Sequence, residues 1–193
     1  VTSSILFVVL TYLFGFSPFL FNRKAPSSNR PTPHQAATYS STLLRESVSV
    51  AQNVISILEI DKSKYSDKLM FEMIAYSLFI TSLHCQREKL PSHKCDETIT
   101  ELTETISADL AKISDSKQST EKELLVATMS HFYKSHVGKS SNAGEMLQSI
   151  ATTMMAEYKS GKTEDFYAMT EIVDTLSKLG KDLNETGFTK SLS

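Results

Sequence analysis

The chain of 193 residues is poor in the residues that turns and sheets require. It has no tryptophan, six glycines, five prolines and two cysteines. No glycine occurs between Gly15 and Gly138, and Pro91 is the one proline between Pro33 and the C-terminus. Sandwiches and barrels place glycine and proline at frequent turns, so these gaps exclude an all-β fold and predict an all-α one.

Two further absences bound the function. The net charge is −2, with no basic stripe along the chain, so the composition gives no reason to expect nucleic-acid binding. The sequence has no Glu-x-x-His, H-E-x-x-H or G-x-S-x-G pattern, which di-iron bundles, zinc proteases and α/β-hydrolases use. It therefore predicts a non-catalytic protein without a cofactor or a metal site.

The segment 68–85 (KLMFEMIAYSLFITSLHC) is expected to form the centre of the core. Glu72 is the one charged residue from Leu69 to Leu83, and apolar residues lie on almost every face of the helix. A helix of this kind must be covered on all sides. Its fifteen apolar-rich residues span roughly 22 Å, which is short of the roughly 30 Å of a bilayer's hydrocarbon. The sequence therefore predicts a buried core helix here rather than a membrane span.

About six amphipathic helices are expected in all, arranged as an antiparallel bundle or as stacked helical hairpins. The first begins at Thr32 and Pro33, with Thr32 as its cap. The core helix follows, and the next opens near Asp96 with a clear apolar stripe: Ile99, Leu102, Ile106, Leu110 and Ile113. Three shorter helices are each bounded by a capping residue and a glycine, from Thr120 to Gly138, Asn142 to Gly161 and Thr163 to Gly180.

A hydrophobic helix is expected ahead of this bundle. Residues 5–21 (ILFVVLTYLFGFSPFLF) are uncharged and reach the lower limit of length for a membrane span. No basic residue stands ahead of them and no small-x-small cleavage pattern follows cleanly, which favours a single-pass membrane anchor over a signal peptide. A helix covered by the domain or by a partner is the third alternative. The basic residues Arg23, Lys24 and Arg30 favour a cytoplasmic domain, but a disulfide would favour the opposite side.

The predicted organisation has four parts. Residues 1–21 form the hydrophobic anchor or signal segment, and residues 22–33 form a basic linker rich in Pro and Ser. Residues 34–180 form the helical domain, and residues 181–193 form a polar tail.

The two cysteines form one candidate site. Cys85 ends the core helix and Cys95 begins the next helix, across a turn that contains Pro91. Antiparallel neighbours would bring them together, so a disulfide is possible in an oxidising compartment, and two reduced thiols are the alternative. His84 and His93 lie beside the cysteines, but their spacing matches no zinc module.

Two groups of side chains are candidates for contact with a partner. Met154 and Met155 widen the apolar face of their helix beyond one seam, and such a face can accept a partner helix or a hydrophobic ligand. Glu97, Glu101 and Glu104 lie along the outer face of their helix, where they form either a solvated surface or a dock for a basic partner. These features predict a membrane-anchored interaction module, an accessory or assembly subunit of a larger membrane complex. The alternative is a secreted or periplasmic helical binding protein with a Cys85–Cys95 disulfide.

Overall fold

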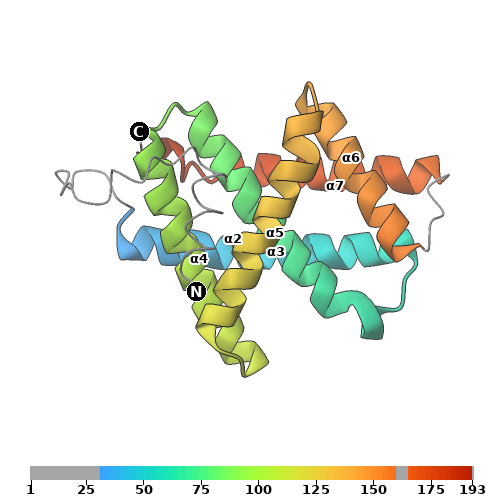
Figure 1. Ribbon diagram of the computed structural model, residues 1–193, viewed down its shortest axis with the longest axis horizontal. Coiled ribbons are helices and arrows are strands. Elements are labelled where there is room, and N and C mark those ends of the chain that lie inside the picture. The colour runs from blue at the N-terminus through green and yellow to red at the C-terminus, as the bar shows by residue number, and fades with distance from the viewer. Residues whose placement is uncertain (1–30, 160–164, 193) are drawn as a thin grey trace.

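The computed structural model describes residues 31–159 and 165–192, which form an all-α bundle (Figure 1). The prediction of an all-α fold is confirmed, and no strand occurs in the described residues. The six α-helices are α2 (Pro33–Leu58), α3 (Lys62–Arg87), α4 (Ser92–Ser114), α5 (Gln118–His136), α6 (Ala143–Tyr158) and α7 (Phe166–Glu185). Two short 3-10 helices, η2 (Val137–Lys139) and η3 (Lys190–Leu192), complete the elements of the described ranges.

The expected hydrophobic helix at residues 5–21 lies outside the described residues, as does all but the end of the linker. Among the helices between residues 31 and 192 that are described, none has both the length and the apolar character needed to cross a bilayer.

Helix α3 is the core element, as its composition predicts. It packs against α2, α4, α5 and α7 and runs diagonally through the centre of the molecule (Figure 1). Every residue from Met73 to Ser82 is buried, so the run covers all faces of the helix. This continuous burial explains why the sequence there shows no polar face.

Polar side chains join α2 to α3 inside the core. The Tyr39 hydroxyl lies 2.9 Å from Thr81 Oγ1, and the Ser47 and Ser77 hydroxyls lie 2.7 Å apart. Both serines also contact a carbonyl oxygen four residues earlier in their own helices, at 2.7 and 2.9 Å. The two serine hydroxyls thus have partners in each other and in two backbone carbonyl oxygens. These hydrogen bonds satisfy polar groups that are buried away from water.

The beginning of α2 matches the prediction. Thr32 Oγ1 accepts a hydrogen bond from the Gln35 N–H at 3.2 Å, and Gln35 Oε1 accepts one from the Thr32 N–H at 2.9 Å. This reciprocal pair is a capping box. The buried face of α2 includes the polar Ser47, whereas the apolar Leu44 and Val48 are half-buried.

Three other helix starts differ from the prediction. Helix α4 begins at Ser92 rather than near Asp96, because Pro91 takes the capping position. Helix α5 begins at Gln118, so Thr120 lies inside the first turn and does not cap it. Helix α7 is capped by Asp165, whose carboxylate accepts a hydrogen bond from the backbone at 3.0 Å; Thr163 and Gly161 lie outside the described residues.

The C-terminal part of the chain packs on the core. Helix α7 passes through Gly180 and ends at Glu185, beyond the expected stop. Leu183, Phe188 and Leu192 are buried. The Phe188 ring stacks on Tyr39, with ring centres 4.1 Å apart. Residues 181–192, expected as a polar tail, therefore place three apolar side chains in the core, and one of them, Phe188, packs against α2.

The apolar stripe of α4 is confirmed except at its last member. Ile99, Leu102, Ile106 and Leu110 are buried, whereas Ile113 is 78% exposed. The turn between α4 and α5 extends beyond the other helices at the lower edge of Figure 1. We call residues 110–124 the α4–α5 tip. Ile113 is exposed because the other helices do not extend along α4 to its end.

Candidate functional site

The two cysteines meet at the corner between α3 and α4. The Leu90 N–H donates a hydrogen bond to the Cys85 carbonyl oxygen at 3.2 Å, and the Cys95 thiol donates one to the Leu90 carbonyl oxygen at 3.7 Å. Both thiols are free and buried. Burial raises the pKa of Cys85 to about 12, and contact with Cys95 adds to the shift. The pKa of Cys95 is also raised, first by burial and then by the Asp96 carboxyl group.

Asp96 is a buried acid that the sequence did not single out. It follows Cys95 in α4 and is 8% exposed. Burial raises its pKa to about 7, and the neighbouring Glu97 adds to the shift. Asp96 therefore exchanges its proton near neutral pH beside the two thiols.

The histidines near this corner do not complete a metal site. His93 is exposed, and His84 is half-buried with its Nδ1 unpartnered. Burial lowers the pKa of His84, and the nearby Arg87 lowers it further. Within the described parts of the chain, no three His, Cys, Asp or Glu side chains are grouped so that they could hold one metal ion.

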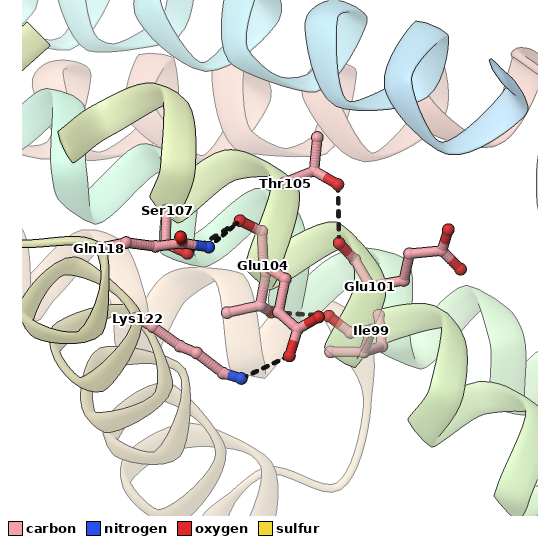
Figure 2. Close-up of polar contacts among 8 residues, drawn as sticks. Ile99, Glu101, Glu104, Thr105, Ser107, Gln118 and Lys122 are labelled. Carbon is pink, nitrogen blue, oxygen red and sulfur yellow. Dashed lines mark hydrogen bonds and ion pairs between the residues drawn. The ribbon is translucent and has the colours of Figure 1, made fainter. Parts of the chain in front are cut away.

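Of the three glutamates expected along the outer face of α4, one links two helices. Glu104 accepts a hydrogen bond from Lys122 of α5 at 2.7 Å, and Gln118 donates to the Glu104 carbonyl oxygen at 3.1 Å (Figure 2). The Glu101 carboxylate points away from this pair (Figure 2). Glu97 and Glu101 are half-buried and Glu104 is exposed. Glu104 thus ties α4 to α5, and Glu101 takes no part in that contact.

The two methionines expected to face a partner lie in the core. Met154 is 4% exposed and Met155 is fully buried, in the hydrophobic core cluster. Packing within the chain therefore occupies both side chains, and neither offers a contact surface. The large apolar side chains that do reach the surface are at other positions: Ile113, Leu124, Phe166 and Tyr167.

A second cluster of ionisable groups joins α3 to the end of α6. The Tyr158 hydroxyl donates a hydrogen bond to Glu72 Oε2 at 2.8 Å, and the Lys68 ammonium pairs with Glu157. Lys68 also lies 5.3 Å from the centre of the Tyr158 ring. Tyr65 packs edge-on against the same ring, with centres 5.5 Å apart.

Burial shifts the ionisation of this cluster. The pKa of Glu72 is raised mainly by burial, against a lowering from the Tyr158 hydrogen bond. The pKa of Tyr158 is raised by burial and by the Glu72 carboxylate. In the sequence, the one indication of this cluster is Glu72, the single charged residue in the apolar run of the core helix. The sequence did not indicate which residue Glu72 contacts.

One histidine–serine contact also escaped the sequence analysis. His136 Nδ1, at the end of α5, lies 2.9 Å from Ser149 Oγ in the middle of α6. His136 is 2% exposed, and burial lowers its pKa, so it is neutral at physiological pH. A buried neutral imidazole that is hydrogen-bonded to a hydroxyl is a structural contact whose polar groups are satisfied. The two residues are thirteen positions apart in the sequence.

Comparisons with known proteins identify no relative of this chain. No family model, no curated protein and no solved structure matches the chain. Its function is therefore inferred from the residues themselves.

Proposed function

We propose that this chain is a membrane-anchored helical interaction module, a non-catalytic accessory or assembly subunit of a larger membrane complex. Residues 5–21 supply the anchor in this proposal, since they are uncharged and long enough to cross a thin bilayer. The helical domain, with its helices connected as an antiparallel bundle, supplies the surface for a protein partner.

The observation that carries the proposal is the exposure of Ile113. It continues a stripe whose four other members are buried, yet 78% of its own surface is exposed. Leu124, in the same α4–α5 tip, is 50% exposed. Burying one such side chain fully is worth about 1.5–3 kcal/mol, so a partner that covers the tip gains affinity from both residues.

The acidic side chains of α4 favour a partner with a basic surface in this proposal. Helix α4 carries five acids from Asp96 to Asp109, with Lys94 before them and Lys112 after them. The Glu101 carboxylate points away from the Glu104–Lys122 pair (Figure 2). A specific protein interface combines apolar contacts with charges that complement those of the partner.

The first test is extraction of the tagged full chain in a mild detergent, followed by mass determination of the purified complex. We expect carbonate-resistant membrane association and a stoichiometric partner. The double variant Ile113→Glu, Leu124→Glu should lose that partner, whereas Tyr167→Ser should keep it, because Tyr167 is equally exposed but lies at the start of α7. A clean monomer, or equal retention by both variants, would contradict the proposal.

The proximity of Cys85 and Cys95 supports a second candidate function. A secreted or periplasmic helical binding protein with a Cys85–Cys95 disulfide is consistent with the contacts of Leu90 to the Cys95 thiol and to the Cys85 carbonyl oxygen. Recovery of a soluble species without residues 1–25, with this disulfide formed, would favour that alternative over the anchored module.

A further inference from the structure

The chain places one of its own ammonium groups among carboxylates and tyrosine rings, where α3 meets the end of α6. Lys68 Nζ pairs with the Glu157 carboxylate and lies 4.0 Å from Glu72 Oε1. It also lies over the Tyr158 ring, 5.3 Å from its centre, which is within the range of a cation–π contact. Tyr65 packs edge-on against that ring. We call Tyr65, Glu72, Glu157 and Tyr158 the ammonium site.

Contacts with the core hold the walls of the ammonium site in place. Tyr158 is 4% exposed, and its hydroxyl donates the 2.8 Å hydrogen bond that fixes the Glu72 carboxylate. Tyr65 is half-buried against the core cluster, and Lys64 lies 4.9 Å from the centre of its ring. A site that is already ordered in this way loses little conformational entropy when a ligand binds.

The electrostatics of the ammonium site favour a cation. Glu157 and Tyr158 lie in the last turn of α6, which contains no basic residue. The carbonyl end of a helix carries partial negative charge, and here it adds to the charge of the carboxylates. Lys159, just beyond the helix, is paired with Asp165 at 3.1 Å. The pKa of Lys68 is raised, first by its hydrogen bond to Glu157, so the site stabilises a protonated amine.

Lys68 occupies the site through a contact that opens to solvent. Its side chain is 53% exposed and that of Glu157 is 43% exposed. Exposed ion pairs contribute little to stability, because two long side chains lose conformational freedom in forming them. Rotation of the Lys68 side chain into solvent would leave the space of one four-carbon chain and one ammonium group, beside the same carboxylate and the same ring.

We propose that the ammonium site binds the protonated amino group of a small aliphatic primary amine, which takes the place of the Lys68 ammonium. The amine donates a hydrogen bond to the Glu157 carboxylate, and its charge lies over the Tyr158 ring. A primary ammonium fits better than a quaternary one, because its N–H groups donate to carboxylates. The inference goes beyond the proposed interaction module and is independent of it, because the site includes no residue of 5–21 or of the α4–α5 tip.

The test titrates butylammonium chloride into the full chain, as wild type and as Lys68→Ala, with sodium chloride at the same ionic strength as the control for screening. Thermal melts and the backbone amide NMR signals of Glu72 and Tyr158 are the readouts. The Tm of Lys68→Ala should rise saturably, and both amide signals should shift. Wild type should show the same shifts at roughly tenfold higher amine concentration, since the amine must displace Lys68.

Two further variants separate the site from general effects of charge. Glu157→Gln, added to Lys68→Ala, removes the contacting carboxylate and should weaken amine binding at least about tenfold. Lys122→Ala is the matched control, because it frees the exposed carboxylate of Glu104 on α4. One exposed carboxylate alone holds an ammonium weakly, so this variant should show no saturable response.

Several results would overturn the proposal. They are the absence of a saturable response in Lys68→Ala, an equal response in Lys122→Ala, and a response that Glu157→Gln leaves unchanged. Wild type decides the question without any variant, because its Glu72 and Tyr158 signals must shift as the amine displaces Lys68. Tetramethylammonium chloride has the charge but no N–H donor, and tighter binding of this ion than of butylammonium would contradict the choice of a primary amine.

Discussion

The Tyr158 hydroxyl donates a 2.8 Å hydrogen bond to the Glu72 carboxylate, which joins the last residue of α6 to the core helix α3. The Lys68 ammonium lies 4.0 Å from the same carboxylate. These contacts partly replace the water that burial removes from Glu72, but burial has the larger effect and raises the pKa of Glu72. The carboxylate is thus retained in a place where its charged form is disfavoured.

Stability should depend on the charge of Glu72. Because its pKa is raised on folding, the folded chain binds the proton more tightly than the unfolded chain does. The free energy of unfolding should therefore fall as the pH rises from the ordinary pKa of a glutamate through the raised value. Glu72→Gln keeps an acceptor for Tyr158 without the charge. It should therefore remove this pH dependence of the free energy of unfolding and be at least as stable as wild type at pH 7.

Urea unfolding of wild type and Glu72→Gln between pH 4 and 8 measures the difference. Glu72→Ala is the matched control, because it leaves the Tyr158 hydroxyl unpaired and should lower the free energy of unfolding by about 1–3 kcal/mol. A Glu72→Gln variant that is clearly less stable than wild type at pH 7 would show that the charge stabilises the fold.

Asp96 should produce a second pH dependence of the same sign. Its pKa is raised by burial to about 7, so stability should fall as the pH rises from about 4, the ordinary value, to about 7. Asp96→Asn should be more stable than wild type at pH 8 by roughly 1–2 kcal/mol, less than full linkage because solvent reaches the carboxyl group. Asp109→Asn, in the same helix but with Asp109 paired with Lys112 at the surface, should change stability by less than about 0.5 kcal/mol.

Two isoleucines one heptad apart in α4 should respond differently to truncation. Ile106 is fully buried, and Ile106→Ala should lower the free energy of unfolding by about 2–5 kcal/mol. Ile113 is 78% exposed, and Ile113→Ala should change it by less than about 0.5 kcal/mol. Denaturant melts of the two variants give the comparison, and a large loss for Ile113→Ala would place that side chain in a packed contact.

The two glycines near the C-terminus should differ in the sign of their alanine substitutions. A Cβ atom at Gly180 would lie 3.7 Å from the Ile80 side chain, an ordinary contact, so Gly180→Ala should stabilise α7 by about 0.5–1 kcal/mol. Gly187 has a φ of +70°, which alanine adopts only with strain, so Gly187→Ala should destabilise the chain by about 1 kcal/mol. Thermal melts of both variants measure whether each substitution raises or lowers stability. A destabilising Gly180→Ala would mean that α7 cannot accept a Cβ there.

Local signals in the sequence located several helix ends because such ends depend on neighbouring residues. Thr32 and Gln35 cap α2 through contacts three residues apart, and Asn142 caps α6 by accepting a hydrogen bond from the Glu145 N–H. Local signals gave the wrong helix boundary where another nearby residue had a larger effect on the backbone or on packing. Pro91 began α4 earlier than expected, and Gly180 did not end α7 because the Leu183 side chain continues the buried face.

The sites needed more than local signals. The sequence placed Cys85 and Cys95 on either side of one turn, and in the structure the Leu90 backbone contacts both residues because the connection is short. It also placed Met154 and Met155 at a widened apolar face, which the fold covers. The bond from Tyr158 to Glu72 joins residues 86 positions apart, and no sequence spacing indicates it.

The sequence by itself determined that the chain is helical and that segment 68–85 is its core, because hydrophobic content and the lack of glycine act over a few turns of chain. Only the tertiary structure decided which apolar and charged side chains are covered. Ile106 and Ile113 have the same side chain and the same place in one stripe, yet one is buried and the other is exposed. Burial depends on which helices pack alongside, and that is a property of distant segments brought together.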